Sequence, residues 1–188
     1  NIYLAEKLRA FHTDYPGIRL RISNHSTPQA LQAVKNGEVD FAVITTPAEV
    51  ESGLKMVELK PFYEVLVGGR TFTALASQNL SLKELNNYPL ISLSDESMTR
   101  AFYRQFFLDH GAVLKPDTEA ATTDQILPMI THNLGIGFYP EELAAEAIAR
   151  SSAYAIRLVE PIPEREICLV TNSSTQMSAA VRKVISFL

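Results

Sequence analysis

One short arrangement of residues occurs twice in this chain and restricts its fold more than any other feature. In each copy, small hydroxyl residues precede a helical pattern, a turn with glycine follows, and an apolar run of strand length comes next. The first copy leads from Ser26 to the run 41–44, and the second leads from Thr122 to the run 136–139. Strands and helices that alternate at this spacing are typical of α/β folds. The sequence therefore predicts an α/β architecture with strand–helix–strand units.

Other segments of the chain show the same alternation. Residues 2–13 have a helical pattern that ends before Pro16, and residues 18–22 alternate apolar and polar side chains as a strand does. The run 41–44 is apolar throughout, which suits a strand buried on both faces. The other expected helices cover 26–35, a short segment from 81, 94–110, 122–132, a segment from 140 and 175–188. The other expected strands cover 65–67, 88–93, 118–121, 136–139, 156–159 and 166–170.

Composition excludes several classes of function. The 17 Lys and Arg against 21 Asp and Glu give a formal charge of −4, which disfavours binding of nucleic acid by this chain. A single cysteine, Cys168, allows no internal disulfide. The apolar runs are far shorter than a membrane span, and no signal segment is apparent at the start. We therefore expect a cytoplasmic protein without a membrane segment.

Residues that carry out catalysis or bind metal are poorly represented. The four histidines have no metal-ligand spacing, the glycines form no phosphate-binding loop, and no Gly-x-Ser-x-Gly motif occurs. Cys168 lies inside an apolar strand pattern, where a buried thiol is inert. We expect no cofactor, no metal and no enzymatic reaction.

Hydroxyl residues at the helix starts allow two interpretations. Backbone N–H groups and the helix dipole favour an anion at a helix N-terminus that follows a strand. Capping of the helix explains the same hydroxyls. The aromatic residues on the helix 94–110 are similarly open to two interpretations, packing in the core or contact with a partner subunit. They are Phe102, Tyr103, Phe106 and Phe107.

Three phrases carry a resemblance to a known family. They are FHTDYPGIRL at 11–20, LQAVKNGEVDFAV at 31–43 and LGIGFYP at 134–140. In this order and spacing they resemble the effector-binding region of LysR-type transcriptional regulators, and the resemblance covers nearly the whole chain.

The resemblance implies a type II periplasmic-binding-protein fold, with two Rossmann-like lobes joined by two crossing strands near 63–67 and 167–170. Lobe I would comprise residues 1–68 and 164–188, and lobe II residues 69–163. The family's N-terminal winged helix-turn-helix domain and the first strand of lobe I are absent from the sequence, so we expect a fragment of a longer protein.

The resemblance also implies a binding site for a small, anionic metabolite between the lobes. Its expected residues are Asn24, Ser26, Thr45, Thr46, Ser94, Ser97, Met98, Thr99, Thr122, Thr123, Phe138 and Tyr139. Arg100 is either an additional cation for the ligand or an exposed helix charge.

By the same resemblance, the chain would sense an inducer for a DNA-binding regulator. Effector domains of this family form a homodimer or tetramer, which makes the helices 2–13 and 94–110 candidate interface elements. DNA would be bound only by the missing N-terminal domain. Two alternatives stay open, a solute-binding receptor of an ABC transporter and an enzyme with the same architecture.

Overall fold

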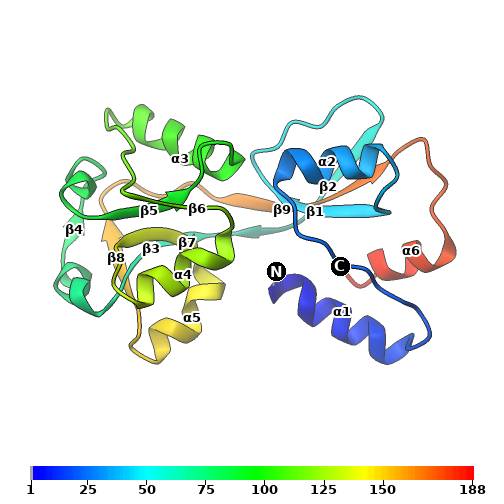
Figure 1. The fold of residues 1–188 in the computed structure, drawn as a ribbon, viewed down its shortest axis with the longest axis horizontal. Coiled ribbons are helices and arrows are strands. Elements are labelled where there is room, and N and C mark those ends of the chain that lie inside the picture. Colours follow the sequence, from blue (N-terminus) through cyan, green and yellow to red (C-terminus); the bar gives the residue numbers. More distant parts are fainter. Residues whose placement is uncertain (1) are drawn as a thin grey trace. The chain divides into compact units, whose positions relative to one another are not determined.

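The computed structural model describes residues 2–188, and for Ile2 and Tyr3 it describes the backbone alone. Asn1, where the expected lobe I begins, lies outside the described residues. The chain forms two compact units, which Figure 1 allows the reader to follow by colour. Unit 1 contains the residues up to Lys60 and Glu166–Leu188, and unit 2 contains Pro61–Arg165. The chain therefore passes between the units twice, at 60/61 and at 165/166.

Unit 1 is built on a three-stranded sheet with the strand order β1-β9-β2. Strand β1 runs antiparallel to β9, with Thr45 opposite Ile167. The elements of the unit are α1 (Ile2–Asp14), α2 (Thr27–Lys35), β1 (Phe41–Thr45), β2 (Leu54–Phe62), β9 (Arg165–Asn172) and α6 (Ala179–Ile185). Strands β2 and β9 both extend to residues of unit 2, so they carry the chain across the boundary.

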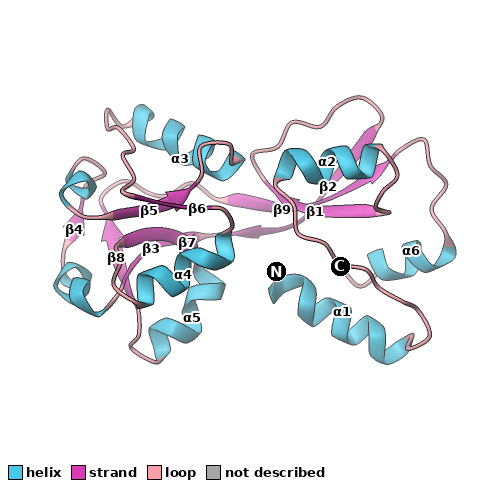
Figure 2. Ribbon diagram, in the orientation of Figure 1, coloured by secondary structure: helices cyan, strands magenta, loops and turns pink. Residues whose placement is uncertain are grey.

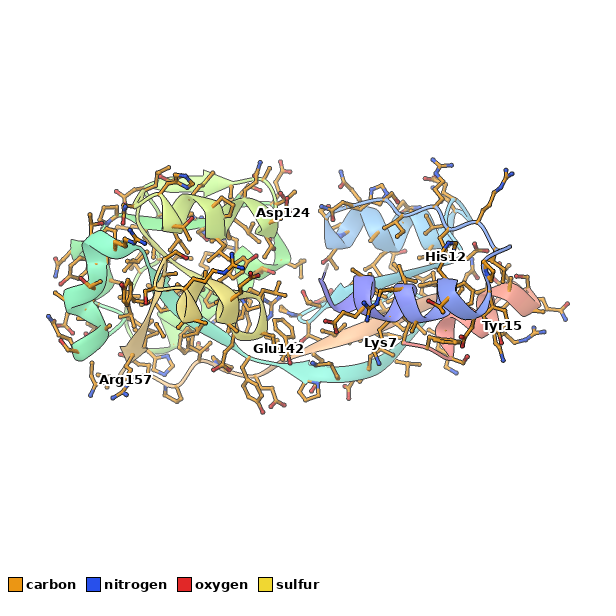
Figure 3. The ribbon with its side chains drawn as sticks, turned by 90° about the horizontal axis from the view of Figure 1, so that it is seen from below. Lys7, His12, Tyr15, Asp124, Glu142 and Arg157 are labelled. Atoms are coloured by element: carbon orange, nitrogen blue, oxygen red, sulfur yellow. The ribbon has the colours of Figure 1, made fainter. Side chains whose placement is uncertain are left out.

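Two groups of apolar side chains hold unit 1 together. The sheet and α2 enclose a small core of Val34, Ile44, Cys168 and Val170. The second group is aromatic and joins the two terminal helices, because the Phe11 ring lies 5.2 Å from Tyr15 and 5.5 Å from Phe187. Figure 3 shows Tyr15 at the end of α1, beside α6.

Unit 2 has a six-stranded sheet with the order β4-β8-β3-β7-β5-β6. Strand β5 is parallel to β6 and β7, whereas β3 is antiparallel to β7 and β8. The strands are β3 (Glu64–Gly68), β4 (Asn79–Leu80), β5 (Leu90–Leu93), β6 (Thr118–Ala120), β7 (Ile136–Pro140) and β8 (Tyr154–Leu158). The helices are η1 (Arg70–Ser77), η2 (Glu84–Asn87), α3 (Met98–Asp109), α4 (Thr123–Thr131) and α5 (Glu141–Ala149), of which η1 and η2 are 3-10 helices.

Helices cover both faces of this sheet, with α3 above it and α4 and α5 below it in Figure 2. Successive side chains of a strand point to opposite faces. Leu66 accordingly packs with Phe107 of α3, whereas the next residue, Val67, packs with Ile130 of α4. Continuous apolar strands are therefore explained in unit 2 by burial on both sides.

The first strand–helix–strand prediction is wrong. Residues 18–22 have no regular structure, and Leu20 and Ile22 are 38% and 65% exposed. A strand needs a neighbour for its backbone hydrogen bonds, and the sheet order among residues 2–188 provides none for this segment. The run 41–44 does form a strand, but β1 lies at an antiparallel edge, and Ile44 is its one buried residue.

The crossing between the units also differs from the prediction. The sequence pattern does not reveal β2, whose residues are mostly exposed, and it predicts the crossing at 63–67. Those residues instead belong largely to β3, inside unit 2. The lobe boundaries at 68/69 and 163/164 stay predictions about the functional lobes.

Most other expected elements are confirmed, with some bounds shorter and some longer than predicted. The helix expected over 94–110 begins only at Met98, because residues 94–97 form a turn in which the Ser97 N–H donates to the Ser94 carbonyl at 3.0 Å. The helix expected over 175–188 is α6 alone. None of the helices found in residues 2–188 combines the length and the hydropathy that crossing a membrane requires.

Candidate functional site

The parallel strands of unit 2 bring several expected site residues to one edge. Strand β5 ends at Leu93 and β6 ends at Ala120, and parallel strands have their carboxyl ends at the same edge. The backbone N–H of Ser94 donates to the carbonyl of Ala120 at 3.0 Å. The turn before α3 and the turn before α4 are therefore adjacent, as expected where an α/β sheet binds ligands.

The turn before α3 contains four of the expected residues. Ser94, Ser97, Met98 and Thr99 are each half-buried. Ser97 is the N-cap residue, and its carbonyl accepts from the N–H of Ala101 at 3.0 Å. The 12-residue helix α3 begins directly at this edge, so its dipole favours a negative charge there.

The turn before α4 is fixed by a glutamine. The Gln125 Oε1 atom accepts from the N–H of Ala121 at 2.9 Å and from the N–H of Thr122 at 3.3 Å. Thr122 is the N-cap residue and Thr123 the first helical residue, and both are half-buried. This arrangement presents two threonines at the start of α4.

Phe138 and Tyr139 lie in strand β7 and are 8% and 6% exposed. Phe138 stacks on Tyr103 with 4.2 Å between the ring centroids, so its ring belongs to the core beneath α3. Burial, and secondarily the Asp124 carboxylate, raises the pKa of Tyr139. Figure 3 labels Asp124 at the start of α4.

Arg100 is buried, with 8% of its surface exposed, so its interpretation as an exposed helix charge is wrong. Its Nη1 atom donates to the carbonyl of Leu93 at 3.0 Å and lies 3.5 Å from the Glu119 carboxylate. Its Nε atom is buried and has no hydrogen-bond partner within the described part of the chain. Arg100 thus joins the ends of β5 and β6 and brings a positive charge to the edge.

The remaining expected residues belong to unit 1. Residues 36–40 connect α2 to β1, so the helix runs back against the strand and its start lies toward the end of β1. Asn24 and Ser26 are exposed before α2, whereas Thr45 and Thr46 are half-buried at the end of β1. The Oγ1 atom of Thr46 accepts from the backbone N–H of Glu166 at 2.8 Å. This hydrogen bond therefore links the residue after β1 to β9.

In both units, a glutamine side chain caps the start of a helix in the same way. In unit 1, Gln29 Oε1 accepts from the Ser26 N–H at 3.1 Å, as Gln125 does for Thr122 in unit 2. The repeat seen in the sequence is therefore confirmed at the level of helix capping. We call the two groups of residues the rims. The rim of unit 1 is Asn24, Ser26, Thr45 and Thr46, and the rim of unit 2 is Ser94, Ser97, Met98, Thr99, Thr122 and Thr123.

The sequence pattern does not reveal the most buried charged residues of unit 2. Glu64 and Arg165 form an ion pair of 2.8 Å, and their side chains are 4% and 3% exposed. Neither residue lies in a motif, and 101 positions separate them, so only the fold brings them together. The aromatic residues of α3 mainly follow the core interpretation, since Tyr103, Phe106 and Phe107 are buried.

Among residues 2–188, no group of three or more His, Cys, Asp or Glu side chains is placed to hold a metal ion. The rims instead supply hydroxyls and helix N-termini. Such groups bind small anions through hydrogen bonds to carboxylate or phosphate oxygens.

The chain matches the model of a family described as "LysR substrate binding domain" over residues 1–188. Among relatives, the HTH-type transcriptional regulator SsuR of Burkholderia cenocepacia is 25% identical over 134 residues, which cover 71% of this chain and 44% of SsuR. The chain spans about half the length of the relatives it matches.

Two solved structures have the same fold. The Synechocystis PCC6803 CcmR regulatory domain in complex with 2-PG matches with a TM-score of 0.86 at 20% identity, over 99% of this chain and 89% of that one. The effector binding domain of QuiR in complex with shikimate matches with a TM-score of 0.82 at 18% identity, over 98% of this chain and 87% of that one. These similarities establish the type II periplasmic-binding-protein-like α/β fold.

Proposed function

Since the chain belongs to the LysR substrate binding domain family, we propose that it is the effector-sensing region of a LysR-type transcriptional regulator. The observation that carries this proposal is the edge of unit 2, where two parallel strands end together and two helices begin. The rim of this unit offers hydroxyls around both helix starts. The comparisons give the alternative of a transporter receptor no support, because the relatives are transcriptional regulators.

The effector is a small anion. Hydroxyls and helix N-termini stabilise a carboxylate or phosphate group, and the Arg100 guanidinium adds a positive charge near the start of α3. The acids bound by CcmR and QuiR, 2-PG and shikimate, belong to this chemical class. In unit 1 and in unit 2, the rim residues are the proposed hydrogen-bond partners of the effector.

The signal is a change in the equilibrium between two conformations. An effector shifts this equilibrium only by its difference in affinity for the two states. A coupling free energy of about 1–3 kcal/mol is typical of such regulation. DNA-binding domains outside this chain convert the shift into a change in transcription, in the cytoplasm.

The oligomer is formed by the effector-sensing regions themselves. Helices α1 and α3 are its contact elements, because α1 has exposed side chains among residues 5–14 and α3 among residues 104–109. On α3, Leu108 is 53% exposed although it is apolar, which suits a residue covered by a partner subunit. Analytical ultracentrifugation of Leu108→Glu against wild type tests this, with loss of the dimer as the expected result and an unchanged mass as the contrary one.

A thermal-shift screen tests the proposed function. The panel contains small carboxylates, amino acids, aromatic acids, 2-PG and shikimate. A compound at a hundred times its dissociation constant stabilises the folded chain by about 2.7 kcal/mol. For a chain of this size that stabilisation raises the melting temperature by about 5–10 °C. If every anion on the panel leaves the melting temperature unchanged while the chain is folded, the proposal is wrong.

A further inference from the structure

The buried ion pair of unit 2 stands where the chain passes between the units. Arg165 is the first residue of β9, and Glu64 follows the last residue of β2, Phe62, by two positions. The pair therefore lies at the start of β9 and two positions beyond the end of β2. The charges are almost completely removed from water, so each depends on its protein partners.

Helix α3 binds both members of the pair. The Nη2 atom of Arg165 donates to Thr99 Oγ1 at 2.9 Å, and the hydroxyl of Tyr103 donates to Glu64 Oε2 at 2.6 Å. Thr99 and Tyr103 are four residues apart, so they lie on the same face of the helix. Glu64 Oε2 also accepts the Arg165 Nη1 hydrogen bond.

Aromatic rings shield this cluster from solvent. The guanidinium carbon of Arg165 lies 5.1 Å from the centroid of Phe62 and 5.1 Å from that of Phe102, a distance at which a cation and a ring attract. Burial, and then the charge of Glu64, raises the pKa of Tyr103 well above its usual value. The Tyr103 hydroxyl therefore stays protonated and remains a donor.

We propose that Arg165 links the first turn of α3, through Thr99, to the start of β9 and, through Glu64, to the chain directly after β2, so that these three segments move together. Thr99 is thus a positioning residue, and not only a contact of the effector. This extension rests on the proposed function, because it makes the rim of unit 2 continuous with the two connections that an effector must influence.

The fixed geometry of the arginine side chain explains why these segments are coupled. A guanidinium has a fixed planar fork, so the direction of its bond to Glu64 also fixes the direction of its bond to Thr99. Moving α3 without moving the connecting strands would leave a buried charged group without one of its partners, which is strongly unfavourable. The first turn of α3 therefore transmits a displacement instead of absorbing it.

Two substitutions at one position separate the hydrogen bond from packing. Thr99→Val keeps the shape and removes the hydroxyl, whereas Thr99→Ser keeps the hydroxyl and removes a methyl group. Hydrogen exchange is measured by mass spectrometry at residues 64–66 and 165–168 of the free chain. We expect Thr99→Val to accelerate exchange in both segments by roughly tenfold, and Thr99→Ser to stay near wild type.

A second pair of variants serves as the matched control. Tyr103→Phe removes the hydroxyl that binds Glu64, and Tyr154→Phe removes one whose partner is the nearby Ser151 carbonyl. Only Tyr103→Phe should accelerate exchange at 165–168. The proposal is overturned if Thr99→Val behaves like wild type, or if Thr99→Ser is as disruptive as Thr99→Val. Because no effector enters this experiment, its failure is distinct from an unresponsive thermal-shift screen.

Discussion

The two rims are chemically similar, but the sheets and cores that hold them differ. In unit 2 the rim stands on a six-stranded sheet in which β7, β5 and β6 run parallel and helices cover both faces. In unit 1 it stands on a three-stranded sheet with a core of four buried residues. The rims therefore owe their likeness to the chemistry of helix starts, and unit 2 is the better anchored of the two.

Substitution in the core of unit 2 should have the largest effect. Phe107 is fully buried beneath α3, and Phe107→Ala should reduce the free energy of unfolding of unit 2 by about 3–5 kcal/mol. Val113→Ala, at a side chain of unit 2 that is 53% exposed, should change this free energy by no more than about 0.5 kcal/mol. Denaturant unfolding, monitored by circular dichroism, measures the free energy of unfolding of both variants. Equal effects of the two substitutions would contradict the assignment of the core.

A smaller change in unit 1 tests whether the units open independently. Ile44→Val should destabilise unit 1 by about 0.5–1.5 kcal/mol. Cys168 is fully buried in the same core, and burial raises the pKa of its thiol, so a thiol reagent reaches it only when unit 1 opens. The labelling rate of Cys168 should rise roughly two- to tenfold in Ile44→Val.

Ile91→Val provides the control for this labelling, because it makes the same change at a buried position of unit 2. Labelling of Cys168 should be as slow as in wild type. A faster rate in Ile91→Val would mean that the units open together, and the comparison between them would fail.

Two exposed carboxylates give the smallest effects. Lys35 lowers the pKa of Glu51 in unit 1, by a hydrogen bond and by its charge. The backbone N–H of Ser81, and then its hydroxyl, lowers the pKa of Glu84 in unit 2. Each carboxylate therefore stabilises the fold above its ordinary pKa of 4.5, and this contribution disappears as the pH falls through the lowered value.

Salt should distinguish these two carboxylates. At about 1 M salt the screening length is about 3 Å, so the pKa of Glu51 should return toward its ordinary value more than that of Glu84. NMR titration of the two side chains at low and high salt measures the difference. Equal changes of the two pKa values with salt would contradict the different causes assigned to Glu51 and Glu84.

The sequence predicted unit 2 better than unit 1 for a physical reason. Strands such as β5 and β7 are almost entirely buried because both faces are covered, and their mostly apolar pattern is visible without a structure. Strand β2 exposes most of its residues and carries no such pattern. Residues 18–22 have the pattern of a strand, but periodicity alone does not supply a pairing partner.

The same difference holds for the candidate site, where local features could be predicted from the sequence and long-range contacts could not. The hydroxyls at Ser26 and Thr122 were visible because capping is a local property of the sequence. The cluster around Arg165 was not, since its members are brought together from positions 101 and 66 residues apart. The burial of Arg100 likewise depends on how β5 and β6 meet α3, which no local pattern reveals.

Calorimetric titration of threonine variants tests most directly whether the rim residues bind the effector. The titrant is the panel compound that raises the melting temperature most. Loss of a hydrogen bond to a charged group amounts to about 1.5–3 kcal/mol, so Thr45→Ala and Thr123→Ala should each weaken binding by tenfold or more. Thr131→Ala, at the opposite end of α4, should bind as wild type does. Unchanged affinity in Thr45→Ala would contradict the assignment of the unit 1 rim to effector binding, and unchanged affinity in Thr123→Ala would contradict that of the unit 2 rim.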